Sequence, residues 1–186
     1  MKDINLFPDK GSIYLKKISS KSQIESDDKF RGYLIESSEK EARRVIDYIK
    51  GKNKVIAFVG GEDSLNRRAI ETLKIDYLIS PEKNCDKDTL KQRDSGLNHY
   101  VVKEASKKDI TIVINMLEFS RLSKKEKALM ASRIIQNIKI CRKADCKIKI
   151  ASFALKKEEV FDEISRKSFG KSLGMSTDQM KESVLF

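Results

Sequence analysis

The residues of this chain that are best suited to chemistry are one histidine, three cysteines and a set of carboxylates. His99 is the only histidine, and it follows a stretch of charged residues, serine and glycine at 93–98. An imidazole in this place could be a catalytic base, a metal ligand, part of a helix start or a contact to RNA. The rest of the sequence has to select among these roles.

A metal-dependent hydrolase needs His, Asp and Glu ligands clustered at strand ends, and one histidine cannot form such a cluster. Carboxylates alone can hold Mg²⁺. Four glutamates lie near the ends of predicted strands: Glu36, Glu62, Glu82 and Glu118. Acidic residues in such places also complement the dipole of a following helix. A divalent-metal phosphoesterase that uses these carboxylates therefore stays an alternative function.

Nucleophilic catalysis is disfavoured because a serine or cysteine nucleophile needs a base beside it. Ser95 lies four residues before His99, but Gly-Leu-Asn between them is typical of a turn followed by a helix cap. The chain also lacks the Gly-x-Ser-x-Gly elbow of the α/β-hydrolases. We therefore predict no catalytic residue and no metal ligand in this chain.

The composition predicts one compact domain. The chain has 186 residues, of which 39% are hydrophobic, so we expect a single domain over 1–186 with the lysine- and serine-rich segment 16–29 as a loop. No apolar run approaches 18 residues, and the start of the chain lacks the apolar stretch of a signal peptide. The three cysteines are scattered and odd in number, which predicts reduced, packed thiols. Together these features predict a cytoplasmic protein that does not associate with membranes.

Short apolar runs alternate with helical segments along the chain. Predicted strands lie at 4–7, 12–15, 33–36, 55–60, 77–80, 110–115 and 148–152. Several are continuously apolar, which is typical of parallel strands covered on both faces. Predicted helices lie at 38–51, 63–74, 124–143, from His99 onward, and twice in the tail, before Gly174 and after Ser176. This alternation indicates an α/β fold, either an open doubly wound sheet or a reduced barrel.

Capping residues and apolar spacing refine two of these helices. Asp63 is predicted to cap the helix at 63–74, and Ser123 with Glu126 to form a capping box before 124–143. The core stripe of the long helix is predicted at Leu129, Ile134, Ile138 and Cys141.

Positive charge is concentrated in the C-terminal part of the chain. The net charge is +11, and residues 121–171 contain fifteen Lys/Arg against six Asp/Glu, a net of +9. A field of one sign suits phosphate binding through the release of counterions. Aromatic residues are only 7% of the chain, and Trp is absent, so we expect contact with the backbone of folded RNA rather than stacking on single-stranded bases.

The start of the helix at His99 offers a place for a phosphate. Asn98 is predicted to cap this helix, whose first turn exposes backbone N–H groups. With Arg93 and Lys103 close in the sequence, an anion could dock there. The residues alone leave two roles open for His99, that of a structural residue of the helix start and that of an RNA contact.

Three stretches resemble the protein component 3 family of archaeal ribonuclease P, which is homologous to the eukaryotic 30-kDa subunit. They are YLISP at 77–81, RDSGLNHYVVKEASKKDITIVINM at 93–116 and FGKSLGMSTDQMKESV at 169–184. In that family a strand ending in Ile-Ser-Pro precedes a glycine–hydrophobe–Asn/Asp–His motif, which matches residues 96–99 here. The resemblance departs at 116–121, where the family usually has Arg-Pro-Leu, and at 151–152, where it often has a Thr/Ser-Ser pair.

The resemblance implies a TIM-barrel-like fold, a reduced βα-barrel similar to the PHP phosphoesterase superfamily but without its metal-binding histidines. It also implies a subunit of ribonuclease P, the ribonucleoprotein that removes the 5′ leader from precursor tRNA. In that enzyme the RNA subunit and its Mg²⁺ perform catalysis, so the protein itself would bind no cofactor. The implied partners are ribonuclease P RNA, the small protein component 2 in a two-plus-two heterotetramer, and precursor tRNA as substrate of the complex.

On this basis we predict two sets of RNA-contact residues. Arg93, His99 and Lys103 form the first set, at the mouth of the loop and helix. The second set lies near strand ends and consists of Arg121, Ser152 and Arg166. A generic RNA- or protein-binding scaffold unrelated to tRNA is the second alternative function.

Overall fold

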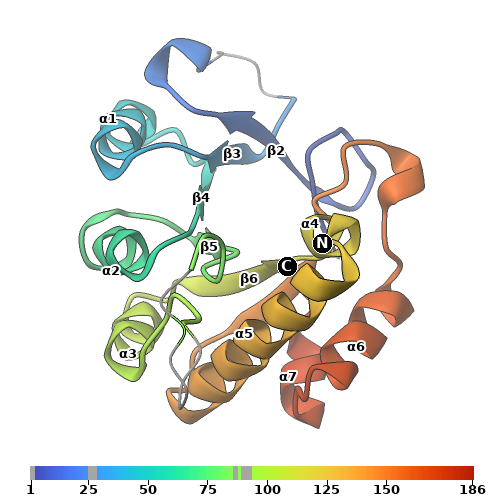
Figure 1. The fold of residues 1–186 in the computed structure, drawn as a ribbon. Coiled ribbons are helices and arrows are strands. Elements are labelled where there is room, and N and C mark those ends of the chain that lie inside the picture. Colours follow the sequence, from blue (N-terminus) through green and yellow to red (C-terminus); the bar gives the residue numbers. More distant parts are fainter. Residues whose placement is uncertain (1–2, 25–28, 86–87, 89–93) are drawn as a thin grey trace.

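The computed structural model describes residues 3–24, 29–85, 88 and 94–186, and it consists of one parallel sheet surrounded by helices (Figure 1). The seven strands pair in chain order, each parallel to the next. They are β1 (Ile4–Asn5), β2 (Ile13–Ile18), β3 (Gly32–Ile35), β4 (Val55–Val59), β5 (Tyr77–Ile79), β6 (Thr111–Asn115) and β7 (Ile148–Ala151). All seven predicted strands are thus confirmed.

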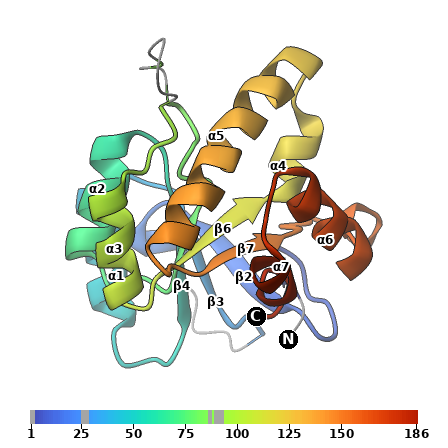
Figure 2. The ribbon, with the colours of Figure 1, turned by 90° about the horizontal axis from the view of Figure 1, so that it is seen from below.

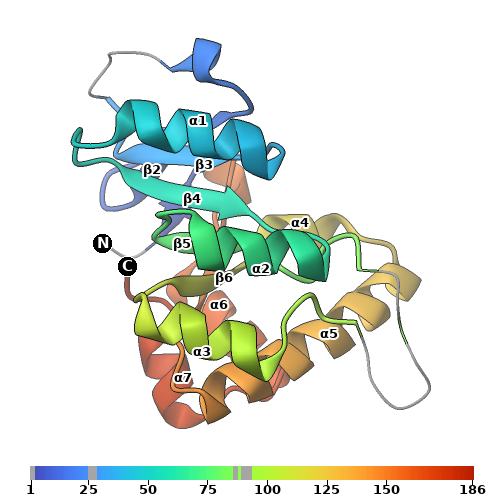
Figure 3. The ribbon, with the colours of Figure 1, turned by 90° about the vertical axis from the view of Figure 1, so that its left-hand side faces the viewer.

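The helices follow the strands and lie outside the sheet (Figures 1 and 3). They are α1 (Glu39–Ile49), α2 (Asp63–Thr72), α3 (His99–Lys107), α4 (Met116–Arg121), α5 (Lys124–Lys143), α6 (Glu163–Ser172) and α7 (Thr177–Glu182), with short 3₁₀ helices η1 (Lys21–Gln23) and η2 (Lys157–Glu159). Within this described part, no helix combines the length and apolar character needed to cross a bilayer.

Backbone hydrogen bonds close the sheet into a barrel. The segment just after β7 lies beside β1, where the Phe153 N–H donates to the Ile4 carbonyl (2.9 Å) and the Leu6 N–H donates to the Ala154 carbonyl (2.8 Å). An open doubly wound sheet would leave these two edges apart. The structure therefore confirms the reduced βα-barrel.

The continuously apolar strands are explained by burial on both faces. Along β6, Val113 points into the barrel with Leu15 and Phe153, while its neighbours Ile112 and Ile114 pack against the outer helices. Since successive side chains of a strand point to opposite faces, both faces require apolar residues.

The structure corrects three local expectations and contains one helix that was not predicted. Segment 16–29 is not all loop, because β2 continues to Ile18 and η1 follows, although residues 25–28 lie outside the described part. Glu62, not Asp63, is the residue before α2, and no side chain caps that helix start. Leu129 faces solvent with 38% exposure, whereas the other three residues of the predicted stripe are buried. The short helix α4 was not expected from its six residues, and the Asn115 side chain caps it.

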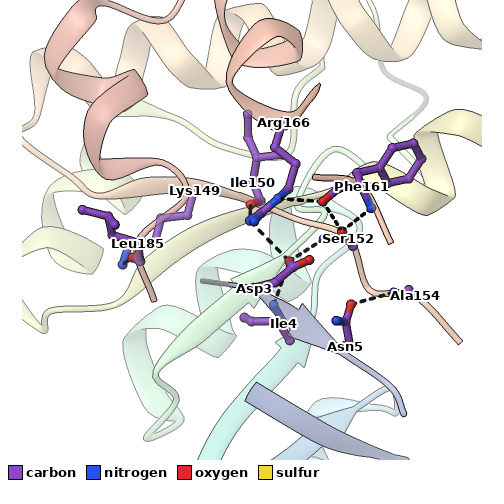
Figure 4. Close-up of polar contacts among 10 residues, drawn as sticks. All are labelled: Asp3, Ile4, Asn5, Lys149, Ile150, Ser152, Ala154, Phe161, Arg166 and Leu185. Atoms are coloured by element: carbon purple, nitrogen blue, oxygen red, sulfur yellow. Dashed lines mark hydrogen bonds and ion pairs between the residues drawn. The ribbon is translucent and has the colours of Figure 1, made fainter. Parts of the chain in front are cut away.

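The ends of the barrel seam are tied together by a buried ion pair between Asp3 and Arg166 (Figure 4). Asp3 Oδ1 lies 3.3 Å from Arg166 Nη1 and accepts hydrogen bonds from the backbone N–H groups of Ile4 (2.8 Å) and Ser152 (2.9 Å). Arg166 also donates to the carbonyl oxygens of Ile150 (3.1 Å) and Phe161 (3.2 Å). One carboxylate therefore connects the first strand, the end of the last strand and α6.

Burial raises the pKa of Asp3, and hydrogen bonds from Ser152 and the charge of Arg166 act against that rise. Asp3 and Arg166 are only 6% and 2% exposed, so each charge depends on the other for compensation. The Ser152 hydroxyl extends this network, since it accepts from the Phe161 N–H (3.0 Å) and lies 3.3 Å from the Phe161 carbonyl.

We predict that Arg166→Met lowers the free energy of unfolding by roughly 3–5 kcal/mol, because it leaves the Asp3 carboxylate buried and unpaired. Lys167→Met is the matched control, since Lys167 forms a partly exposed pair with Glu163, one turn earlier on α6, and its loss should change stability by less than about 1 kcal/mol. Urea unfolding followed by circular dichroism measures both. The double variant Asp3→Asn/Arg166→Met should recover part of the lost stability, because it removes the unpaired carboxylate. Equal stability of Arg166→Met and Lys167→Met would contradict this account.

Candidate functional site

The loop that follows β5 carries the Gly-Leu-Asn-His stretch and is fastened to α2 by the buried side chain of Asn66. The Asn66 Nδ2 atom lies 2.7 Å from the carbonyl oxygens of Gly61 and Pro81 and 2.8 Å from that of Gly96. Its Oδ1 atom accepts the Gly61 N–H at 2.9 Å. One amide thus holds both the beginning and the end of the loop against the turn after β4.

Each of the first three residues of the motif has a structural role. Gly96 has a positive φ of 71°, and a Cβ atom there would lie 1.9 Å from the Pro81 carbonyl oxygen, so only glycine fits. Leu97 is buried, with 4% exposure. The Asn98 side chain accepts the Val101 N–H at 3.0 Å and caps α3, as predicted. The motif is therefore largely a device that sets the start of α3.

Helix α5 holds the same loop from the other side. Gln136 Nε2 lies 3.0 Å from the Ser95 hydroxyl, and Asn137 Nδ2 lies 3.0 Å from the Ser95 carbonyl. Arg133 forms an ion pair of 3.4 Å with Asp88 and is only 6% exposed. Arg133 therefore stabilises the loop after β5 and is not part of the exposed basic surface of α5.

His99 and Lys103 differ from the rest of the motif because both are exposed on α3. They lie four residues apart, and therefore on one side of the helix. Neither forms a hydrogen bond or ion pair of its side chain within the described residues. The third member of this set, Arg93, lies outside the described residues.

Sequence reasoning missed two neighbours of His99. Tyr100 is 58% exposed, and the Arg67 guanidinium lies 5.8 Å from the centre of its ring. Arg67 in turn pairs with Glu71 at 2.9 Å. An exposed aromatic residue next to a histidine was the available signal for Tyr100, but the approach of Arg67 depends on the packing of α2 beside α3.

The second predicted set does not form one exposed surface. Ser152 and Arg166 are 0% and 2% exposed and are engaged in the network that closes the barrel. Arg121 is exposed at the end of α4 and pairs with Glu159 at 2.7 Å. In this fold Ser152 and Arg166 hold the seam of the barrel, and Arg121 alone of the three faces solvent.

The barrel mouth, at the carboxyl ends of the strands, contains a cavity of about 350 Å³ whose lining is mostly apolar but includes Lys17, Glu36, Lys83, Glu118 and Arg121. Lys83 reaches between two carboxylates there, with its Nζ atom 3.0 Å from Glu36 Oε1 and 3.1 Å from Glu118 Oε1. Lys17 also pairs with Glu36, at 2.5 Å. Burial lowers the pKa of Lys83, but Glu36 and Glu118 outweigh that effect and raise it. The hydrogen bond from Lys17 is the main cause of the lowered pKa of Glu36.

The four glutamates of the metal-site alternative have different environments. Glu36 and Glu118 share Lys83, Glu62 is exposed before α2, and Glu82 is buried beside Asn137. Across the residues described, no group of three or more His, Cys, Asp or Glu side chains is placed to hold a metal ion.

Helix α5 presents several cations to solvent. Ser123 and Glu126 form the predicted capping box at its start, and Figure 2 shows this start close to α4. The exposed lysines of the helix that form no ion pair within the described part are Lys124, Lys125, Lys139 and Lys143. Arg142 is exposed as well, but it donates to Gln179 at 2.9 Å. Of the positive charges concentrated at 121–171, the lysines of α5 named above lie on the surface, whereas Arg133 and Arg166 are buried.

Comparison with known proteins finds relatives among archaeal ribonuclease P proteins. The chain is 22% identical over 121 residues to ribonuclease P protein component 3 of Methanococcus vannielii, covering 65% of this chain and 49% of the relative. It is 30% identical over 124 residues to the protein of the same name from Methanococcoides burtonii, covering 66% of this chain and 47% of the relative. The chain thus spans about half the length of these relatives. No protein-family model matches it.

Solved structures agree on the fold. A chain in the cryo-EM structure of archaeal ribonuclease P with mature tRNA superposes with a TM-score of 0.65 at 22% identity, covering 82% of this chain and 65% of that chain. A prolidase complexed with N-methylphosphonate-L-proline superposes with a TM-score of 0.55 at 12% identity, covering 78% and 35%. These comparisons confirm the resemblance to component 3 and the TIM-barrel-like fold.

We predict a pH dependence of stability from Glu82, whose pKa burial raises from 4.5 to about 7. The folded state then keeps a proton that the unfolded chain releases, so the free energy of unfolding falls as pH rises between about 4.5 and 7, by at most about 1.4 kcal/mol per pH unit. Glu82→Gln should remove this decline. Urea unfolding from pH 5 to pH 8, with the exposed Glu158→Gln as control, measures it, and parallel curves for all three proteins would exclude the effect.

Proposed function

We propose that this chain is a protein subunit of ribonuclease P that binds and stabilises the RNA responsible for catalysis. The observation that carries the proposal is the exposed pair His99 and Lys103 at the start of α3, in a chain similar to ribonuclease P protein component 3. The other motif residues work within the fold, so the side chain of His99 is the one left to meet a partner.

The start of α3 suits a phosphate of the RNA backbone. The Asn98 side chain accepts the Val101 N–H, which leaves the preceding N–H groups of the first turn for an anion. Lys103 adds a positive charge on the same side of the helix, and Arg93 adds another close in the sequence. We infer that His99, Lys103 and Arg93 form one contact set.

The exposed lysines of α5 add a second, less specific contribution. They carry charges without carboxylate partners in the described part of the chain, which favours phosphate contacts through counterion release. Arg121 lies at the barrel mouth near the start of α5 and joins this surface in the proposal. Ser152 and Arg166 support it indirectly, because they hold the barrel closed.

We propose that the barrel mouth is not a catalytic centre. Lys83 places a cation between Glu36 and Glu118, at the position where a metal phosphoesterase would need a divalent ion. Catalysis is therefore assigned to the RNA subunit and its Mg²⁺, and the protein needs no cofactor of its own.

The proposed partners follow from the same assignment. They are ribonuclease P RNA, protein component 2 in a two-plus-two heterotetramer, and precursor tRNA as substrate of the assembled enzyme, with the cytoplasm as its location. A generic RNA scaffold would instead bind structured RNAs irrespective of their identity, so competition between ribonuclease P RNA and an unrelated folded RNA distinguishes the two functions.

We predict that His99→Ala/Lys103→Ala leaves the fold intact and lowers RNA-dependent cleavage of precursor tRNA by roughly tenfold at limiting protein, because phosphate contacts are lost. Reconstituted cleavage at modest Mg²⁺ measures the effect, and circular dichroism checks the fold. Lys181→Ala, an exposed residue of α7, is the control. Cleavage equal to that of the control would reduce His99 to a structural residue of the helix start.

A further inference from the structure

A second charged cavity lies at the amino ends of β2, β3 and β4, the end of the barrel opposite to the start of α3. Its volume is about 650 Å³. In Figure 3 this is the end away from the arrowhead of β4. The described cations that line it are Lys10, Lys29, Arg31, Lys52 and Lys54, and among the described lining residues Asp9 is the one carboxylate.

Three separate turns build this cavity, and the sheet fixes their relative positions. They are the turn before β2, the residues before β3 and the turn before β4. The Arg31 N–H donates to the Tyr14 carbonyl (2.8 Å), and the Arg31 carbonyl accepts the Val55 N–H (3.1 Å). Lys54 Nζ lies 3.0 Å from the Phe30 carbonyl oxygen. The cations are thus held on a preformed frame.

Some cations of the cavity lining form no ion pair within the described part of the chain. Lys10 and Arg31 are exposed and form no ion pair within the described part of the chain, and Lys52 lies over the ring of Tyr48, 4.6 Å from its centre. Cations gathered around one hollow repel one another, and an anion placed between them relieves that repulsion. The cavity therefore favours an anionic occupant.

The aromatic residues of the cavity point to phosphates rather than bases as the group that binds. Phe30 is 3% exposed, and Lys54 and Lys16 approach its ring at 4.8 and 6.0 Å from the centre. Tyr14 meets Phe30 edge to face, with ring centres 6.3 Å apart. A base would need a free ring face on which to stack, and Phe30 offers none.

We propose that this cavity binds phosphates of an RNA backbone and forms a second RNA-contact surface of the chain. The inference rests on the proposed function only for the choice of RNA among polyanions. Contacts of this kind are independent of base sequence and position the protein on its RNA. With the start of α3 at the other end, the barrel would contact RNA at both of its ends.

The test compares two double charge reversals in the full chain. Lys10→Glu/Arg31→Glu changes the cavity, and Lys40→Glu/Lys181→Glu changes two exposed lysines of α1 and α7 that form no ion pair in the described part. Both variants alter the net charge equally, so any difference between them is local. Binding to a duplex RNA of about 20 base pairs is measured from 50 to 200 mM salt, with circular dichroism to check the fold.

Each phosphate contact contributes about 0.9 to the slope of log affinity against log salt, so loss of two contacts makes the fall in affinity over this range about tenfold smaller. We expect this decrease in salt dependence for Lys10→Glu/Arg31→Glu and a smaller decrease for the control Lys40→Glu/Lys181→Glu. Equal slopes for the two variants would overturn the proposal. So would loss of binding to phosphatidylserine vesicles with unchanged RNA binding, because the cavity would then be a lipid-headgroup site.

This measurement uses the chain alone and a plain duplex, without precursor tRNA. A subunit that fails to promote tRNA cleavage but shows the expected difference in salt slope would refute the proposed function and leave the cavity assignment standing. A subunit that promotes tRNA cleavage but gives equal salt slopes for the two double variants would refute the cavity assignment alone.

Discussion

A buried ion pair between Asp3 and Arg166 lies at the seam of the barrel, beside the backbone hydrogen bonds that close it. The pair joins residues at opposite ends of the sequence and ties β1 to the end of β7 and to α6. A buried pair of this kind contributes little net stability, but removal of one partner leaves an uncompensated charge. Both partners are therefore needed at the seam, and the closed barrel fixes the positions of the loops at both of its ends.

The loop after β5 shows which residues of a short motif the fold itself requires. Gly96 is required by the approach of the Pro81 carbonyl, and Asn98 is required as the cap of α3. Asn66 holds both ends of the loop in place. With these needs met inside the molecule, His99 projects from a fixed helix start, which is the arrangement that a positioned contact to a phosphate requires.

The elements of the fold could be predicted because burial on both faces gives apolar strands, and because capping boxes mark helix starts such as that at Ser123. The six residues of α4 are too few to show a helical period. The roles of Ser152 and Arg166 could not be predicted, since their partner Asp3 is about 150 residues or more away in the sequence and meets them only when the barrel closes.

Surfaces were predicted less well than helices and strands, because a surface can combine residues that are distant in sequence and meet only in the folded chain. The start of α3 lies within one stretch of sequence, so the placement of His99 and Lys103 on one helix could be predicted there. The basic cavity at the other end combines three turns that are distant in sequence, so a count of charges along the chain, which singled out 121–171, does not detect it. Pairing of strands in chain order brings these turns together.

The measurement that tests the central claim most directly is cleavage of a precursor tRNA at modest Mg²⁺ by cognate ribonuclease P RNA. It is made with and without this chain and the proposed small partner, protein component 2, and with the proteins alone. The account predicts cleavage that requires the RNA and increases when the chain is added. EDTA-sensitive cleavage by the protein alone would contradict it and would make the carboxylates at the barrel mouth the candidates for an active site.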